Sequence, residues 1–252
     1  MRNTFKLLDI FKANIKELVD KEKYEKNDLL NERFLITNRD EIAIYYSSHN
    51  EMINEKAEIL IVGICPGWRQ MERSIRLTKK LLSVSISDDE ISRRVKLKTR
   101  LFGTTRNNLI NMLSSLELHK MLGISSADKL FDDEYKYLHT TSLIRYPVFI
   151  SGKNYNGNVP SLLKNDFLFN IASKSIKNEI NSLSKVKLIL PLGKAVEKFL
   201  CNIYAKDKNI YEKIIKGFPH PSGLNGHRIR FFKENFSDLR LQFLAKFEES
   251  NH

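Results

Sequence analysis

Apolar residues are arranged along the chain in a way that predicts strands alternating with helices. Segments 57–62 and 186–193 are almost continuous in aliphatic residues, as is typical of strands buried on both faces of a parallel sheet. Further strands are predicted at 138–145 and, as a short segment, at 214–218. The predicted strands run into polar, proline- or glycine-containing turns.

The segments around these strands have the features of helices. Apolar residues three and four positions apart predict an amphipathic helix at 8–18 and another at 109–116. The highly charged segment 71–100 is also predicted to be helical, and its basic cluster 93–98 forms either a solvated helix face or a contact with DNA. Further helices are predicted at 194–200 and near the carboxyl end, around Leu239, Phe243 and Leu244.

This alternation indicates a parallel sheet that is covered by helices on both faces. We therefore predict an α/β protein: a single three-layer α/β/α domain over residues 1–252, with a short central parallel sheet and with residues 1–54 as an amino-terminal helical extension. In such sheets, ligands bind at the carboxyl ends of the strands. The polar and glycine-rich segments of the chain fall at those ends, so the functional site is expected there.

The composition is that of a folded domain, and the charge points to a polyanionic partner. Hydrophobic residues make up 42% of the chain, which is enough for a sizeable core. The formal net charge of +12 raises the local concentration of polyanions, among which nucleic acid is the obvious candidate. A chain that simply overuses lysine and asparagine would have a similar charge, so the charge alone leaves both explanations open.

Nothing in the sequence indicates a metal, an organic cofactor or a membrane partner. Cys65 and Cys201 lie far apart and share no metal-ligand or disulfide spacing, and the six histidines are scattered. The first residues lack the apolar segment of a secretion signal, and no stretch is long and apolar enough to span a bilayer. We expect a cytoplasmic protein that works without a cofactor or metal.

Four short motifs occur in order along the chain. Gly63-Ile64-Cys65-Pro66-Gly67 follows the first predicted strand, and His220-Pro221-Ser222-Gly223-Leu224-Asn225 follows the last. Between them lie Phe102-Gly103 and Thr141-Ser142-Leu143. This set resembles the uracil-DNA glycosylase superfamily, in which the first motif lines a base pocket, a phenylalanine stacks on the pyrimidine, and a His-Pro-Ser motif precedes a loop that wedges into DNA.

The resemblance implies an enzyme that flips a nucleotide out of DNA and hydrolyses its N-glycosidic bond. His220 is then the catalytic histidine, which donates a hydrogen bond to an oxygen of the departing base. Leu224 fills the vacated space in the duplex, and the small residues Ser222 and Gly223 let backbone amides approach phosphates. The expected DNA-binding residues are Pro221, Ser222, Gly223, Leu224, Asn225, His227 and Arg228.

The same resemblance assigns a base pocket to the turns at the carboxyl edge of the sheet. Some of its expected residues have a structural alternative: Phe102 as a core residue, Trp68 in packing, and Arg145 with Tyr146 at a surface ion pair. The expected pocket residues are Gly63, Ile64, Cys65, Pro66, Gly67, Trp68, Phe102, Ser142, Arg145 and Tyr146.

The sequence departs from the superfamily pattern at positions that orient water and recognise the base. Cys65 stands where many relatives have Asp or Asn, Ile64 where one branch has Glu, and Ser142 where the base-reading Asn is expected. A site built around one base edge rejects others, so these changes predict a different substrate. Two cysteines are too few for an iron-sulfur cluster. The group that positions the water is then sought among Gln70, Asn154 and Asp166.

We therefore predict a monofunctional DNA glycosylase for a modified or damaged pyrimidine, in a setting such as defence against modified phage DNA. No lysine or amino-terminal proline motif indicates a lyase step. Two alternatives stay open: a protein that flips or senses bases without cutting, and an enzyme of small-molecule nucleoside metabolism. An inactive relative would show the same replacements at Cys65 and Ser142.

Overall fold

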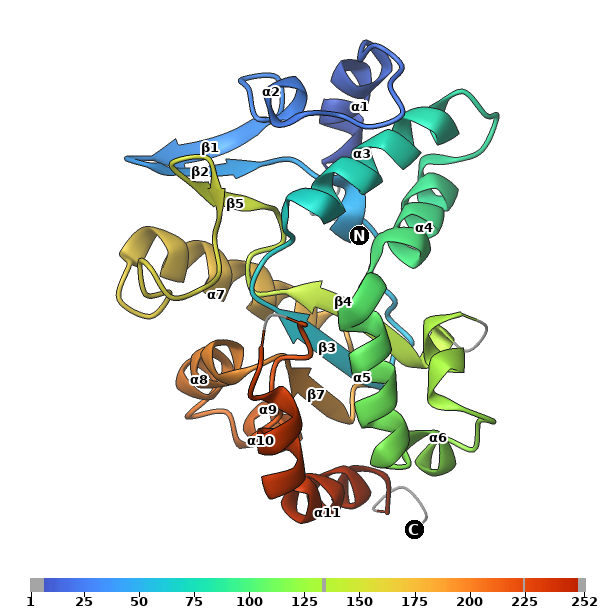
Figure 1. Ribbon diagram of the computed structural model, residues 1–252, viewed down its shortest axis with the longest axis vertical. Helices are drawn as coiled ribbons and strands as arrows, with labels where there is room; N and C mark the ends of the chain where they lie inside the picture. Colours follow the sequence, from blue (N-terminus) through green and yellow to red (C-terminus); the bar gives the residue numbers. More distant parts are fainter. Residues whose placement is uncertain (1–6, 133–134, 224, 249–252) are drawn as a thin grey trace.

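The computed structural model describes residues 7–132, 135–223 and 225–248. In this part of the chain the structure is mixed α/β and contains a parallel and an antiparallel sheet (Figure 1). The parallel sheet lies among helices in the lower part of the molecule, and the antiparallel sheet lies in the upper part with the amino-terminal helices. Within the described ranges, no helix is long and apolar enough to cross a membrane.

The parallel sheet confirms the predicted centre of the fold. Its strands are β4 (Leu138–Ser142), β3 (Ile59–Gly63) and β7 (Leu188–Pro191), in that order. The register aligns Ile59 with Leu138 on one side and with Leu188 on the other. Because β3 and β7 are aliphatic and covered on both faces, all of their residues except Gly63 are buried.

The strands are shorter than the sequence indicated: β7 spans only Leu188–Pro191 of the predicted 186–193, and two other segments are also cut back. Segment 214–218 is reduced to a single parallel bridge between Ile189 and Ile214, and Gly217 then turns the chain with a φ of 79°. Segment 138–145 ends as a strand at Ser142, although the next amide, that of Leu143, still donates to the Gly63 carbonyl at 2.9 Å. Backbone pairing therefore continues past the strand ends and reaches the first motif.

Helices cover both faces of this sheet, which gives the three-layer α/β/α arrangement (Figure 1). Side chains of β3 alternate between the two cores: Leu60 and Val62 pack on the side of α7 (Asp166–Asn181) and α8 (Lys194–Ile203). Ile59 and Ile61 pack on the opposite face of the sheet, against a second set of helices. This second set consists of α5 (Gly103–Ser115), α6 (Leu118–Met121) and α11 (Phe236–Glu248). The remaining short helices of the lower part are η2 (Ala127–Phe131), η3 (Tyr135–Tyr137), α9 (Lys208–Lys213) and α10 (Arg228–Glu234).

The amino-terminal segment is not the helical extension that the sequence indicated. Residues 35–45 form a hairpin of β1 (Leu35–Arg39) and β2 (Ile42–Tyr45), which continues into β5 (Val148–Ile150) and β6 (Lys153–Asn154) in the order β1-β2-β5-β6. The hairpin turns at Asp40, whose φ is 53°, and the alternating burial of β2 has the period of a strand. Pairing of β2 with β5 makes the hairpin 35–45 part of a sheet built from two distant parts of the chain.

Four helices complete the upper part of the molecule: α1 (Leu8–Lys16), α2 (Lys26–Leu29), α3 (Trp68–Leu82) and α4 (Asp88–Thr99). The predicted helix at 8–18 is confirmed, and its Phe11 ring stacks on Tyr46 at a centroid distance of 4.3 Å. The predicted helix at 71–100 is two helices, because Ser87 starts a new one. Its side chain accepts a hydrogen bond from Glu90 N at 3.2 Å, and three acidic residues fill the first turn.

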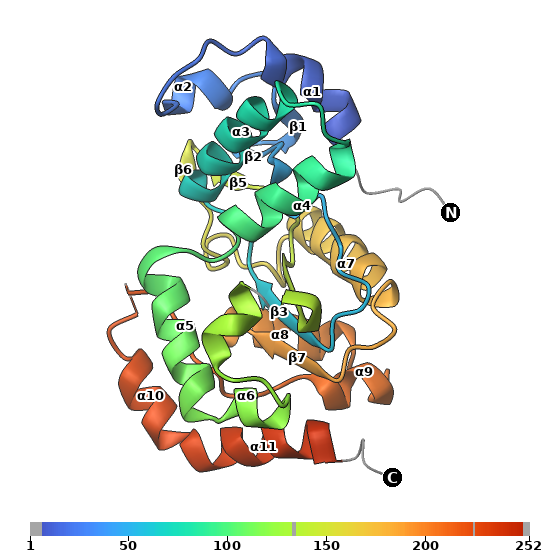
Figure 2. The same ribbon diagram turned by 90° about the vertical axis from the view of Figure 1, so that its right-hand side faces the viewer.

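A cluster of buried polar side chains joins the upper part of the molecule to the parallel sheet. Residues 47–51, a wholly polar run that includes η1 (Ser48–Asn50), are all at most 5% exposed. Figure 2 shows α4 lying between the upper helices and the sheet. We call the following residues the buried polar cluster: His49, Asn50, Glu51, Lys96, His139, Arg145 and Glu179.

The central group of this cluster is the carboxylate of Glu179 on α7. It accepts from His139 Nε2 at 2.6 Å and from Arg145 NH1 at 3.2 Å. Burial opposes its ionisation, but Arg145, His139 and Lys96 together outweigh that effect and hold the pKa of Glu179 at about 2. Asn50 links the cluster to α4, since its Oδ1 accepts from Lys96 Nζ at 2.5 Å and its Nδ2 donates to the Arg145 carbonyl at 2.8 Å.

Replacing Lys96 should reveal the cost of burying its ammonium group. Burial lowers the pKa of Lys96 from 10.5 to about 7, with Arg145 and Arg100 adding to the effect and Glu179 opposing it. Between these two values the unfolded chain binds more protons than the folded one, so this group makes stability rise with pH. From pH 7 to 9, the free energy of unfolding of the wild type should therefore gain about 2 kcal/mol relative to Lys96→Gln in urea denaturation.

The matched control is Lys98→Gln, which removes an exposed lysine from the same helix. Its difference from the wild type should stay constant over this pH range. A constant difference for Lys96→Gln as well would contradict the assignment of Lys96 as a buried, readily deprotonated group.

Candidate functional site

The carboxyl edge of the parallel sheet brings the first motif and the middle motif together. Gly63 at the end of β3 is in register with Ser142 at the end of β4. Beyond the strands, the Ile144 amide donates to the Ile64 carbonyl at 2.9 Å. A Cβ at position 63 would lie 3.6 Å from Ser142 Oγ, so the two chains are in close contact here. The predicted neighbours Gly63, Ile64 and Ser142 are thus adjacent.

The turn of the first motif leads directly into α3, and the two candidate water-positioning amides lie beside it. Gly67 is the residue before the helix and has no side chain to cap it, so the Trp68 amide donates instead to Asn154 Oδ1 at 2.9 Å. Gln70 Oε1 accepts from the Gly67 amide at 3.4 Å. Both Gln70 and Asn154 therefore lie at the expected edge, with their oxygens engaged in capping α3.

Gln70 also connects the first motif to the buried polar cluster. Its Nε2 lies 3.3 Å from His49 Nε2, and His49 Nδ1 lies 2.9 Å from Thr99 Oγ1. Because Thr99 Oγ1 donates to the Val95 carbonyl, it accepts from His49, which leaves His49 Nε2 to accept from Gln70. Burial holds the pKa of His49 well below its ordinary value, in agreement with this neutral form.

Cys65 lies in an apolar setting at the bottom of the turn. Burial raises the pKa of its thiol to about 12, and its Sγ donates to the Tyr155 carbonyl at 3.6 Å. A thiol with this pKa is protonated at neutral pH and is no nucleophile. The neighbouring Ile64 packs on Gly157, and Pro66 is buried, so this part of the motif supports the loop 154–157.

The loop of the second motif lies against the end of β7. Gly193 follows this strand with a φ of 90°, and a Cβ there would lie 3.0 Å from His220 Cβ. The Leu192 amide pairs with the Val62 carbonyl of β3 at 2.8 Å, so the end of β7 on which His220 packs is next to the strand that carries the first motif. The sheet thus places His220 on the same edge as Gly63 and Ser142.

The hydrogen bonds of His220 define which nitrogen bears the proton. The Ser222 amide donates to Nδ1 at 3.1 Å, and burial lowers the pKa of the ring. The ring is therefore neutral at pH 7 and has its hydrogen on Nε2, for which no acceptor is found among the described residues. Asn225 fixes the backbone of the loop by donating from Nδ2 to the His220 carbonyl at 3.0 Å.

The rest of the second motif packs against the start of α5. Asn108 Nδ2 donates to the Pro221 carbonyl at 2.8 Å, and a Cβ at Gly223 would lie 3.4 Å from Thr104 Oγ1. His227 is exposed, with its ring 6.3 Å from Phe231, and Arg228 NH1 donates to the Asn225 carbonyl at 3.1 Å. Leu224, the expected wedge, lies outside the described residues.

Other expected site residues have structural partners or lie elsewhere. Arg145 pairs with Glu179, and the Tyr146 hydroxyl donates to Glu51 Oε1 at 3.0 Å, so both belong to the buried interior rather than to a surface ion pair. Phe102 is half-buried, with the Arg73 guanidinium 4.6 Å from its ring centre. Trp68 packs on the upper core, and Asp166 is an exposed residue at the start of α7.

The buried polar cluster was not predicted from the sequence, although one of its residues, Lys96, lies in a segment that was. Lys96 lies in the basic segment 93–98, where a solvated face was one of two interpretations. Lys96 follows Ser92 by four residues, so the two side chains lie on the same face of α4, and that face is buried. Residues 47–51 gave no such signal, because five consecutive polar residues have the pattern of a loop.

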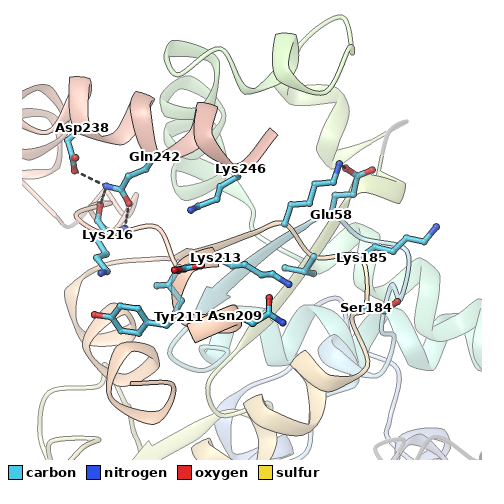
Figure 3. Close-up of a pocket in the computed structure, with 14 residues that line it drawn as sticks. Glu58, Ser184, Lys185, Asn209, Tyr211, Lys213, Lys216, Asp238, Gln242 and Lys246 are labelled. Atoms are coloured by element: carbon cyan, nitrogen blue, oxygen red, sulfur yellow. Dashed lines mark hydrogen bonds and ion pairs between the residues drawn. The ribbon is translucent and has the colours of Figure 1, made fainter. Parts of the chain in front are cut away.

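A cavity of about 1150 Å³ lies at the other end of the sheet (Figure 3). Glu58 and Lys187, which precede β3 and β7, form part of its wall. It is therefore separated from the motifs by the length of the strands. Among the described residues, no three His, Cys, Asp or Glu side chains are grouped so that they could hold a metal ion.

The fold and this edge define an α/β protein whose glycine-containing motifs meet at the carboxyl ends of a three-stranded parallel sheet. Over 218 residues the chain is 38% identical to YoxB of Bacillus subtilis (strain 168), a protein described as uncharacterized; the aligned region covers 86% of this chain and 85% of YoxB. The chain belongs to the family of YoxB. No family model matches the chain.

Gly157→Ala should destabilise the protein through the first motif. The φ of 87° is unfavourable for alanine, and the added Cβ would lie 2.5 Å from Ile64 Cδ1. We expect a loss of about 1–3 kcal/mol in the free energy of unfolding, measured by urea denaturation. Gly226→Ala is the control: its Cβ meets nothing within 4 Å, and its effect should stay within about 0.5 kcal/mol. Equal effects of the two changes would contradict the packing of Gly157 on Ile64.

Proposed function

We propose that the protein is a monofunctional DNA glycosylase that hydrolyses the N-glycosidic bond of a modified or damaged pyrimidine. The observation that supports this most is the state of His220. It is neutral, half-buried and fixed at the carboxyl edge of the sheet, and its Nε2–H is left to bind a ligand. The proposed site needs no metal and no organic cofactor, and the protein would act in the cytoplasm.

The proposed reaction replaces the bond between the sugar and the base nitrogen with a bond to water. As the bond breaks, its electron pair leaves with the base, and the sugar takes on oxocarbenium character. His220 Nε2–H would donate to a pyrimidine oxygen and stabilise the negative charge that develops there. Water adds to the sugar carbon and loses a proton to solvent or a nearby base, and the departing base takes up a proton. The product is an abasic site.

DNA would reach this edge through the loop of the second motif and the start of α10. The described residues 220–223 and 225–228 include Ser222 and Gly223, whose small size lets backbone amides approach phosphates. Gly223, His227 and the neighbouring Arg230 are exposed. Together with the net charge of +12, these features favour a polyanionic substrate over a free nucleoside.

The residues that replace the superfamily pattern favour a modified base. Cys65 offers a thiol where superfamily members have an amide or a carboxylate that orients water. Ser142 offers a small hydroxyl where they have an amide that recognises the base. Phe102 could stack on a base only on the ring face that Arg73 leaves free, unless the guanidinium moves. A base with an additional substituent would suit such a site, and modified phage DNA is a source of such bases.

A second candidate is a protein that binds and flips bases without cutting. One observation favours it: the oxygens of Gln70 and Asn154 both accept hydrogen bonds that cap α3, and Asp166 is exposed at the start of α7. For hydrolysis, Asn154 or Gln70 would have to hold water through those hydrogen-bonding positions of its side-chain amide that are not used in capping α3. A solvent-derived water that is oriented by the sugar itself is the alternative.

Formation of abasic sites on a panel of DNAs is the test of the proposal. The panel contains uracil, oxidised, deaminated, hydroxymethylated and glucosylated pyrimidines, and intact modified phage DNA. We expect product on modified pyrimidines. His220→Ala should lower the rate by roughly 10²–10³-fold, because a donor to the developing charge is lost, while DNA affinity changes little.

Two variants separate the role of His220 from a structural one. His220→Gln keeps an N–H donor and should retain more activity than His220→Ala. His119→Ala removes a half-buried ring on α6, outside the motifs, and should leave the rate within a few-fold of the wild type. If no substrate gives an abasic product although binding is retained and weakened by salt, the protein is the base-sensing binder instead.

A further inference from the structure

The cavity at the amino ends of β3 and β7 is an open groove with a volume of about 1150 Å³. Its floor is formed by residues just before these strands, and its walls by α9 on one side and α11 on the other (Figure 3). β3 spans five residues, so roughly 17 Å separates this end of the sheet from the carboxyl edge. The groove is therefore distinct from the candidate glycosylase site.

The carboxylates in the groove are engaged by other side chains. Glu58 Oε2 is paired with Lys187 Nζ at 2.9 Å, and Asp238 Oδ2 accepts from Gln242 Nε2 at 2.7 Å. Glu212 Oε1 lies 3.7 Å from Nζ of Lys208, a residue that does not line the groove. Five lysines line the same groove: Lys185, Lys187, Lys213, Lys216 and Lys246.

Most of these lysines have no carboxylate partner. In the described part of the chain, no ion pair is formed by Lys185, Lys213 or Lys246, and Lys216 Nζ lies 4.3 Å from the ring centre of Tyr211. Figure 3 shows Lys246 on α11 and Lys213 at the end of α9 extending into the space between their helices. Ammonium groups that line a concave surface create a positive potential that concentrates anions.

We propose that this groove binds the phosphate backbone of nucleic acid, as a contact surface additional to the carboxyl edge. Lysines act on phosphates as point charges and do not present the planar fork with which arginine reads bases. Ser184 and Asn209, which also line the groove, are hydrogen-bonding groups of the kind that contact phosphates. The ammonium of Lys216 lies over one face of the Tyr211 ring. The binding is therefore independent of base sequence.

This inference does not require hydrolysis at the carboxyl edge. A duplex without any modified base contains all the chemistry that the groove recognises. Failure to find a glycosylase substrate would therefore leave the groove proposal untouched, and loss of the groove would leave the chemistry of His220 untouched.

The test measures binding of an unmodified, fluorescein-labelled DNA duplex by anisotropy over a range of salt concentrations. The groove variant combines Lys185→Gln, Lys213→Gln and Lys246→Gln in the full chain. Each phosphate contact contributes about 0.9 to the slope of log affinity against log salt, so the slope should decrease by about 2 to 3. The affinity at about 0.1 M salt should fall roughly tenfold or more.

The control variant combines Lys16→Gln, Lys23→Gln and Lys80→Gln, which are exposed in the upper part of the molecule. It removes the same charge and should change the affinity less than about threefold. Equal weakening by the two variants would overturn the proposal and leave a generic basic surface. No effect of the groove variant would overturn it as well, as would displacement of the duplex by micromolar nucleoside triphosphate, which would identify a small-ligand site.

A measurement on the wild type keeps the proposal testable if the groove variant fails to fold. Lysine acetylation followed by mass spectrometry should show that the duplex protects Lys185, Lys213 and Lys246. Lys23 should be acetylated equally with and without DNA. Unchanged acetylation of the groove lysines would contradict the proposal.

Discussion

The carboxylate of Glu179 is the charge around which the structure is organised. It lies in the interior on α7 and is bound by His139 on β4 and by Arg145 in the following segment. Removing one partner of such a pair leaves an uncompensated buried charge, at a cost of about 3–5 kcal/mol. Arg145 is in turn joined to α4, because Asn50 binds both the Arg145 carbonyl and Lys96. The network around Glu179 therefore links α4 to the parallel sheet.

The candidate site lies at the periphery of this network. A chain of hydrogen bonds runs from Thr99 through His49 and Gln70 to the Gly67 amide, and so reaches the turn of the first motif. The position of that turn depends on the neutral form of His49, since its Nε2 must accept from Gln70. The geometry of the expected base pocket is thus determined largely by buried polar residues that no motif contains.

The sequence allowed the parallel sheet to be predicted, because β3 and β7 are buried on both faces and need uninterrupted aliphatic residues. It also located the edge on which Gly63, Ser142 and His220 lie, because strand ends and turns coincide there. The hairpin at 35–45 was missed because its strands are short and partly polar, and their partner β5 lies about a hundred residues away in sequence. Residues 47–51 could not be assigned to the interior, since the partners that satisfy their polar groups come from four other segments.

The absence of an acidic residue at position 65 follows from the packing around it. The Cys65 thiol faces the Tyr155 carbonyl, and the apolar Ile64 beside it supports Gly157 of the same loop. A carboxylate in this half-buried place would face the Tyr155 carbonyl oxygen, which is an acceptor and cannot compensate the charge. The present packing of loop 154–157 therefore disfavours a water-activating carboxylate at position 65. If the proposed hydrolysis takes place at this edge, Asn154 of this loop is then one of the residues left to hold the water; a protein that only senses bases would need no such residue.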